Sequence, residues 1–492
     1  MTPPDYLFDL KSLGAKVPAQ APEKSQRYVF AAPIRGELIL CGNHPGQKQF
    51  SYQSDIEPLA SLGQDCLHPK LRDWIHIAFS AHMADRLAPR PCILDARYGD
   101  GPWAREMDIS FGVSEPGFWN SRDLKEALEE VLSFLTGDIW KFHFHQLPQK
   151  DFQESLQLRI QQPDALPRFM DVALFSGGLD SFAGAVHYGQ IHKGPMLLVS
   201  GASSSRMRTG QKRLFEQFRA AWPLKFFAVQ IPYRFEDKGA YGAHDITQRT
   251  RGFLHVSLGL VACLLSKVKS LSILENGIGV LNLPMDCSQV AQQASRPANP
   301  VFLSKMENLA KMITGQPVNI HLPYILKSKA ELLHMIKDAP IISGLSETFS
   351  CDHFPDYHEG APQCGACTSC LLRQMALEQG GIGDQYDRHT YANYYSNLEA
   401  WNPDKRMGLW KMDEFCSRIE RLLRSPNPEK AIIGRYPMLR QMRHILSQDG
   451  KMDPQTFTQG IIHLLTAHCA EWKNFSGARA FHHFLNNRKK AA

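Results

Sequence analysis

The sequence predicts an α/β protein built on a parallel sheet with helices on both faces, with an α+β domain before it and a helical extension after it. Short apolar segments alternate with helical patterns from residue 169 to residue 274, and such alternation is typical of parallel sheets covered by helices. Different patterns flank this region on both sides. We therefore expect three parts, at residues 1–165, 166–380 and 381–492.

The N-terminal part is predicted to be an α+β domain. Apolar residues three and four positions apart indicate two amphipathic helices, and Pro89 ends the first of them. His143 and His145 share one face of the last strand, but such a pair is more often structural than metal-bound. Because this part has no catalytic motif, we interpret it as a recognition or docking domain. The predicted helices lie at residues 71–83 and 124–135, and the predicted strands at residues 27–30, 37–40, 107–113 and 139–147.

The central and C-terminal parts differ in pattern. Two prolines at residues 163 and 167 mark the boundary before the central part, whose strands are short and apolar, as buried parallel strands are. The C-terminal part shows only helical patterns, and we interpret it as an appendage that offers a surface to a partner. The predicted central strands are 171–175, 196–200, 226–231 and 271–274, the central helices 181–189, 211–221 and 249–265, and the C-terminal helices 413–423, 436–446 and 454–468.

The composition is that of a globular protein in water. Hydrophobic residues make up 43% and charged residues 21% of the 492 residues, and no apolar run approaches the roughly 20 residues of a membrane span. The first residues lack the basic start and apolar core of a signal peptide. We expect a cytoplasmic protein with no membrane contact. The net charge of +6 permits a nucleic-acid partner without arguing for one.

The sequence Ser-Gly-Gly-Leu-Asp-Ser at residues 176–181 follows a predicted strand and precedes a predicted helix. Glycines let the main chain approach a ligand closely, and the free N–H groups at a helix start attract an anion. Ser176 and Ser181 add hydroxyl donors for a phosphate. Asp180 would repel a bare phosphate, so we expect it to bind Mg²⁺, directly or through water. An ordinary strand-to-helix turn is the alternative interpretation.

Two further segments are expected at the same edge of the sheet. The segment 275–279, which contains Asn276 and Gly277, directly follows the strand at 271–274, and ligands of parallel sheets bind beyond the carboxyl ends of the strands. Arg251 lies near the start of the long helix predicted at 249–265. Its guanidinium either contacts a phosphate or ribose or lies on the surface.

Lys327 and Lys329 flank a predicted helix start. Ser328 is the expected N-cap, and Glu331, three residues later, completes a capping box. Lysines at a helix start oppose the helix dipole, so an anionic ligand would explain both of them. Solvated surface charge is the alternative.

Four of the eleven cysteines lie close together in the sequence. Two-residue gaps let neighbouring thiolates reach one ion, and four thiolates form a closed tetrahedral zinc site with a structural role. An iron–sulfur cluster and four free cysteines are the alternatives. His353 and His358 could replace one sulfur, although we favour four sulfurs. The predicted zinc ligands are Cys351, Cys364, Cys367 and Cys370.

The glycine loop resembles the pyrophosphate loop of ATP pyrophosphatases that adenylate their substrates. Together with the Lys-Ala-Glu helix start at residue 329 and the cysteine block that ends at Arg373, it resembles the QueC family, the 7-cyano-7-deazaguanine synthases, over residues 170–378. The resemblance implies a HUP-like adenylating pyrophosphatase fold, a structural zinc, and Mg²⁺-ATP-dependent adenylation of a 7-deazaguanine carboxylate. We assign catalytic roles to Asp180, Lys327 and Lys329. We assign nucleotide binding to Ser176, Gly177, Gly178, Leu179, Asp180, Ser181, Arg251, Asn276 and Gly277.

The chain also departs from that family. The large N-terminal part has no counterpart in biosynthetic members, and residues 201–206 lack the family's Tyr-Gly-Gln element. The extended architecture is similar to the QueC-like proteins of bacterial antiphage operons, notably the QatC components of Qat systems. This likeness implies protein partners from the same defence operon and transfer of the activated acyl group to an amine. It leaves open whether the product is a nitrile, an amide or a protein conjugate.

Two rival functions remain at this point. A nucleic-acid-modifying ATP pyrophosphatase, such as a tRNA thiolase or ligase, would need redox-active or cluster-binding cysteines and a stronger basic patch. A nucleotide-gated scaffold of a defence complex would bind ATP only to order an assembly. Turnover of ATP to AMP distinguishes the enzymes from the scaffold.

Overall fold

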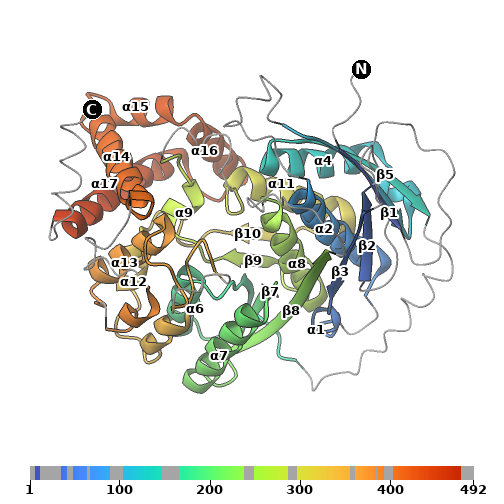
Figure 1. Ribbon diagram of the computed structural model, residues 1–492, viewed down its shortest axis with the longest axis horizontal. Coiled ribbons are helices and arrows are strands. Elements are labelled where there is room, and N and C mark those ends of the chain that lie inside the picture. Colours follow the sequence, from blue (N-terminus) through green and yellow to red (C-terminus); the bar gives the residue numbers. More distant parts are fainter. Residues whose placement is uncertain are drawn as a thin grey trace.

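A ten-stranded sheet with helices packed on both faces runs through the molecule (Figure 1). The strand order is β10-β9-β6-β7-β8-β3-β2-β1-β4-β5. The structure is a computed structural model, and it describes residues 6–11, 35–40, 48–63, 67–88, 104–146, 166–237, 249–285, 296–354, 361–383, 385–392 and 403–477.

The half of the sheet formed by the central part of the chain is entirely parallel. Val172 pairs with Leu197 on one side and with Leu271 on the other, which places β6 between β7 and β9. The predicted strands and their parallel arrangement are confirmed, whereas the short strand β10 was not predicted. The five parallel strands are β6 (Asp171–Leu174), β7 (Met196–Ala202), β8 (Phe226–Asp237), β9 (Ser270–Ile273) and β10 (Asn319–His321).

Each face of this parallel sheet buries its own hydrophobic core. Successive strand side chains point to opposite faces, so Leu197 and Val199 of β7 join one core, while Met196 and Leu198 join the other. The first core contains helices α8 and α11, the second contains α6, α7 and α12, and α13 contributes residues to both. These helices span α6 (Leu179–Ile191), α7 (Ser205–Ala221), α8 (Arg251–Ser266), α11 (Pro300–Thr314), α12 (Lys329–His334) and α13 (Thr368–Gln379).

The N-terminal part continues the same sheet. Strand β3 pairs antiparallel with β8, and Ser54 lies opposite Tyr233. The predicted helices and the strands at 107–113 and 139–147 are confirmed, and the segment at 27–30 lies outside the described residues. The elements of this part are β1 (Tyr6–Lys11), β2 (Arg35–Leu40), β3 (Lys48–Ser54), α1 (Glu57–Ala60), α2 (Pro69–Leu87), β4 (Glu106–Val113), α3 (Pro116–Trp119), α4 (Arg122–Thr136) and β5 (Ile139–Gln146).

A buried polar network joins this part to the central part. The Arg105 guanidinium lies 2.5 Å from Asp85 Oδ1 of α2 and 2.6 Å from Asp138 Oδ2. The other oxygen of Asp85 accepts hydrogen bonds from the backbone N–H and the hydroxyl of Thr250, at the start of α8. Breaking a buried ion pair by removing one partner is strongly destabilising, so this network fixes α2 against α8.

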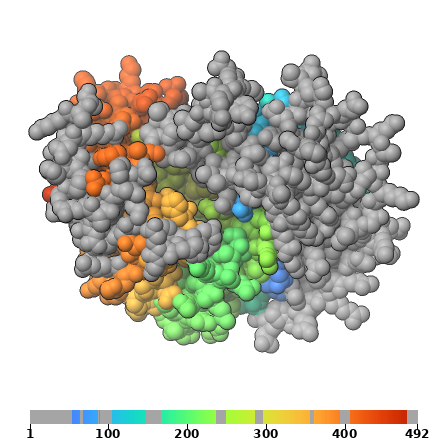
Figure 2. All heavy atoms as spheres, viewed as in Figure 1, coloured from blue at the N-terminus to red at the C-terminus, as the bar shows by residue number. Residues whose placement is uncertain are grey.

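The C-terminal part is helical, as predicted, and packs against the parallel half of the sheet. Helix α17 contacts α9 and α13, and α16 contacts α11; in the space-filling view the orange C-terminal helices adjoin the yellow atoms of the central part (Figure 2). Among the described residues, no helix combines the length and the hydropathy that crossing a membrane requires. The remaining elements are α9 (Gly277–Leu281), η2 (Ile342–Glu347), η3 (Arg388–Thr390), α14 (Pro403–Leu423), α15 (Pro428–Arg435), α16 (Met438–Gln448) and α17 (Pro454–Gly477).

Candidate functional site

The topological switch point of the parallel sheet lies between β6 and β9. From β6 the chain proceeds to β7 and β8 on one side, and then returns to β9 and β10 on the other. The connections after β6 and β9 run in opposite directions, which leaves a crevice at the carboxyl ends of these two strands. Ligands of such sheets bind in this crevice. The glycine loop at 176–181 follows β6, and Glu275 follows β9. Both segments therefore reach the switch point.

The glycine loop is held in a compact turn by its own side chains. Gly177 has a φ of +83°, and a Cβ there would lie 2.8 Å from the ring of Phe349, so only glycine fits this position. The hydroxyl of Ser176 accepts a hydrogen bond from Gly178 N at 3.1 Å and lies 3.2 Å from the hydroxyl of Ser181. Gly178 is the N-cap of α6 and precedes Leu179. The predicted loop residues are therefore brought together.

Asp180, in the first turn of α6, forms an ion pair with Lys329, in the first turn of α12. Both side chains are 14% exposed. Glu275 lies beside this pair: burial, with the neighbouring charge of Asp180 adding to it, raises the pKa of Glu275 to about 8. Two carboxyl groups and one ammonium group are therefore concentrated at the ends of β6 and β9, where a divalent cation would favour the ionised form of Glu275 and an anionic group could bind beside it.

Asn276 and Gly277 lie beside these groups and connect them to Lys327. The side-chain oxygen of Asn276 caps α9 by accepting hydrogen bonds from Ile278 N and Gly279 N, while its amide donates to Glu275 at 2.8 Å. The backbone N–H of Gly277 donates to the carbonyl of Lys327 at 2.8 Å. The side chain of Lys327 is exposed, unlike that of Lys329.

Arg251 is placed in a different environment from the other predicted site residues. It is exposed at the start of α8, and its charge acts on three buried groups: His82, His255 and Tyr233. His82 comes from α2 and His255 from α8, so the structure groups Arg251 with the boundary between the N-terminal and central parts. Its nucleotide-binding role remains a prediction.

Three residues of this region were assigned no role from the sequence, although Glu275 belongs to the segment 275–279 that was expected at this edge. Gln211 of α7 is fully buried and donates from Nε2 to the carbonyls of Ser176 and Gly201, so it fixes the glycine loop to the end of β7. Glu275 had a detectable signal, because an acidic residue directly after a buried strand lies at the ligand edge. Gln211 and Phe349 had none, because their contacts join segments distant in the sequence.

The four predicted zinc ligands come together, with their sulfur atoms all within 4.8 Å of one another. The backbone N–H groups of Ala366 and Cys367 donate to Cys364 Sγ at 3.4 and 3.3 Å, and Cys364 N donates to Cys351 Sγ at 3.3 Å. Such N–H donors stabilise thiolates, and four sulfurs at this spacing fit a tetrahedral zinc ion. The cluster could therefore hold a metal such as zinc, whereas His353 is not one of the clustered ligands and His358 lies outside the described residues.

Residues 349–351 link this cysteine cluster to the glycine loop. Phe349 N donates to the carbonyl of Gly177 at 3.2 Å, and the Phe349 ring stacks on Phe354 with centroids 4.2 Å apart. The guanidinium of Arg373, at the end of the cysteine motif, donates a hydrogen bond to Ser350 Oγ at 3.2 Å and so holds residues 349–351 in place. Because Cys351 follows directly, the position of the cluster constrains the loop.

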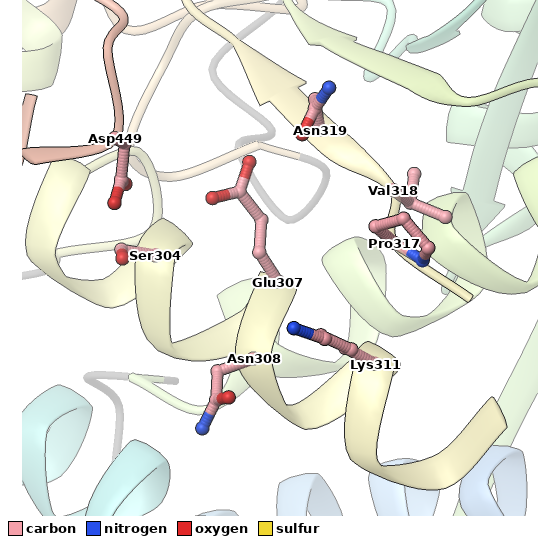
Figure 3. Close-up of a pocket in the computed structure, with 8 residues that line it drawn as sticks. All are labelled: Ser304, Glu307, Asn308, Lys311, Pro317, Val318, Asn319 and Asp449. Atoms are coloured by element: carbon pink, nitrogen blue, oxygen red, sulfur yellow. The ribbon is translucent and has the colours of Figure 1, made fainter. Parts of the chain in front are cut away.

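A hollow in the surface lies elsewhere, beside the amino end of β10 (Figure 3). Its volume is about 360 Å³, and it is lined by residues of α11, by residues 317–319 and by Asp449. Of its two carboxylates, Glu307 already accepts hydrogen bonds from Ile320 N and from Lys451 at 2.7 Å, and Asp449 lies 3.6 Å from Lys451. This hollow is at the opposite end of the strands from the switch point and is not part of the candidate site.

The fold and the site define a class: an α/β protein with a glycine loop at the switch point of a parallel sheet and a four-cysteine cluster beside it. The sequence model of the family "Queuosine biosynthesis protein QueC" matches residues 289–381, which include α11, β10, α12 and the four clustered cysteines. The glycine loop lies outside this match.

Curated relatives agree with the family match. The chain is 26% identical over 238 residues to the 7-cyano-7-deazaguanine synthase 2 of Desulfitobacterium hafniense (strain Y51), covering 44% of this chain and 91% of the relative. It is also 26% identical over 241 residues to the 7-cyano-7-deazaguanine synthase of Azoarcus sp. (strain BH72), covering 44% of this chain and 96% of that relative. The chain is therefore QueC-like, with more than half of its length outside these alignments. The likeness to QatC components remains a prediction.

Proposed function

We propose that this chain is an AMP-forming enzyme that uses Mg²⁺ and ATP to adenylate the carboxylate of a 7-deazaguanine. The observation that carries the proposal is the convergence of the glycine loop with the ion pair of Asp180 and Lys329 at the switch point of a QueC-like chain. Both alignments described above are to proteins named as 7-cyano-7-deazaguanine synthases, which supports this substrate class.

The proposed roles follow from the chemistry of adenylation. A carboxylate oxygen of the substrate bonds to the α-phosphorus of ATP, the bond to the bridging oxygen breaks, and pyrophosphate leaves with the electron pair. The N–H groups of residues 177–181 would bind the pyrophosphate, and Lys329 would neutralise charge on the transferring phosphate. Asp180 and Glu275 would hold Mg²⁺, which when bound offsets the negative charge of the phosphates.

The cysteine cluster has a structural role in this proposal. Four thiolates leave no open coordination position for a substrate, so Cys351, Cys364, Cys367 and Cys370 would hold a zinc ion that fixes residues 349–351 against the glycine loop. The residues themselves supply no step of the reaction.

We further propose that the activated acyl group passes to an amine, with a protein partner of an antiphage system as one acceptor. The support is the extra chain. More than half of this chain lies outside the alignments, which cover 91% and 96% of the two relatives. The N-terminal part would present the partner to the carboxyl edge of the sheet.

The test is ATP turnover by the full chain with 7-carboxy-7-deazaguanine, followed as AMP and pyrophosphate release. We expect AMP only with Mg²⁺ and the carboxylate present, and faster release when an amine acceptor is added. Binding of ATP without any AMP would contradict the enzyme and favour a scaffold. Mass spectrometry of co-purified neighbouring gene products tests the protein acceptor, with a mass increase on a lysine or N-terminus as the expected result.

A further inference from the structure

Helix α17 of the C-terminal part contacts the start of α12 at two points. The hydroxyl of Ser328 donates to Glu471 Oε1, and His463 Nε2 lies 3.0 Å from Glu331 Oε1. Ser328 and Glu331 are the two members of the capping box of α12: Ser328 Oγ accepts from Glu331 N at 3.0 Å, and Glu331 Oε2 accepts from Ser328 N at 2.7 Å. Each member of the box is therefore held by one residue of α17.

The first turn of α12, which this capping box stabilises, also supplies Lys329 to the candidate site. Lys329 pairs with Asp180, and the carbonyl of Lys327 accepts from Gly277 N. A Cβ at Gly277 would lie 2.5 Å from Leu464 of α17, so α17 packs closely on this junction. A shift of the Ser328 backbone would move Lys329 relative to Asp180, because Ser328 is the N-cap of α12 and Lys329 is the first residue of this helix.

The two contacts differ in strength. The Glu471 side chain is 11% exposed and Ser328 is buried, and a hydrogen bond to a buried carboxylate is among the stronger kinds. His463 is 62% exposed, where water and salt weaken an ion pair. Glu471 is therefore the principal contact and His463 the secondary one.

We propose that Glu471 is a positioning residue for Lys329, so that helix α17 is a component of the candidate active site and not only a partner surface. Glu471 lies outside residues 289–381, which match the QueC family, and it acts on the site through Ser328. This inference rests on the proposed adenylating function for its kinetic consequence, but its structural part stands on the contacts alone.

The test compares Glu471→Ala with Glu471→Gln, which keeps an oxygen acceptor for the Ser328 hydroxyl. Lys473→Ala is the matched control: it lies two residues away on α17, is 69% exposed and pairs with Glu420 at 3.4 Å. Hydrogen exchange of the amides at residues 328–332 is measured on the full chain without ligand, and kcat and KM for AMP formation are measured separately.

We expect Glu471→Ala to speed exchange at these amides roughly tenfold, the effect of losing one hydrogen bond to a buried carboxyl group. It should lower kcat by a similar factor with a smaller change in the KM for ATP, because Lys329 acts on the transferring phosphate. Glu471→Gln should recover most of both effects, and Lys473→Ala should match the wild type.

Unchanged exchange at residues 328–332 in a folded Glu471→Ala variant would overturn the proposal, as would equal losses in Glu471→Ala and Lys473→Ala. Should Glu471→Ala fail to fold, Glu471→Asp, whose carboxyl group lies one methylene further from the Ser328 hydroxyl, gives the same comparison: faster exchange at these amides supports the proposal, and wild-type exchange overturns it. A wild-type chain that forms no AMP would refute the proposed function, while the exchange measurement would still decide whether α17 holds this turn.

Discussion

The carboxylate of Asp180 accepts a hydrogen bond from the ammonium group of Lys329, 149 positions further along the chain. The first turns of α6 and α12 therefore meet, and each supplies one charge to the same point at the carboxyl edge of the sheet. Under the proposed function, a divalent cation bound by Asp180 would release the ammonium group that neutralises this carboxylate in the absence of ligand. Lys329 would then be free to contact the anion that the cation accompanies.

We expect Asp180→Ala to leave the fold intact and to lower AMP formation roughly 100-fold or more, because it removes the proposed Mg²⁺ ligand and the partner of Lys329. Circular dichroism checks the fold, and AMP release checks the activity. Asp123→Ala is the matched control, since Asp123 is an exposed acidic residue in the first turn of α4. AMP release at the wild-type rate by folded Asp180→Ala would refute the assignment.

The two lysines beside Ser328 should behave differently. Lys329 is largely buried and pairs with Asp180, whereas Lys327 is exposed. We expect Lys329→Ala to lower kcat roughly 100-fold and Lys327→Ala to lower it less than about tenfold, because water and salt screen an exposed charge. Steady-state AMP formation at two salt concentrations makes the comparison. Equal losses in both variants, or a larger loss in Lys327→Ala, would reverse the assigned roles.

Elemental analysis should find about one zinc per chain, and Cys367→Ser should lose it. Because metal binding contributes to folding, the melting temperature of this variant should fall by several degrees. Its affinity for ATP should also fall, because Phe349 joins the cysteine cluster to Gly177. The control is Cys263→Ala, a buried cysteine outside the cluster, which should keep its zinc. Iron with visible absorption would favour the thiolase alternative.

The stability of the chain should depend on the titration of Glu471. Burial raises the pKa of this carboxyl from 4.5 to about 7, with the charge of Glu331 adding to the shift. The folded chain then binds a proton more tightly than the unfolded chain, so this group's contribution to the free energy of unfolding falls as pH rises from about 4.5 to 7.

The comparison with Glu471→Gln isolates this contribution. Nearby His468, whose pKa burial lowers to about 4, and Glu331 are present in both proteins. The wild type should lose roughly 1–3 kcal/mol relative to the variant between pH 4.5 and 7.5, as measured by denaturant unfolding at each pH. A difference that does not change with pH would show that Glu471 titrates normally.

Local sequence patterns predicted most of the helices and strands and most of the residues of the candidate site. Apolar periodicity located every long helix of the central part up to α8, and the capping box of Ser328 and Glu331 is present as predicted. Cys364, Cys367 and Cys370 lie within seven residues of one another, and the cluster predicted from this spacing is present. The helices, the cap and these three cysteines depend on neighbours within a few residues, which is why the sequence alone indicates them.

Only the tertiary structure decided which of these segments meet. Local sequence does not specify strand order, so it could not place β6 beside β9, join β3 to β8, or bring Lys329 and not Lys327 to Asp180. The same is true of Gln211, Phe349 and Glu471, whose partners lie from 10 to 172 positions away. Contacts over such separations are selected by the packing of the whole core, because a buried polar group is stable only where the fold provides its partner.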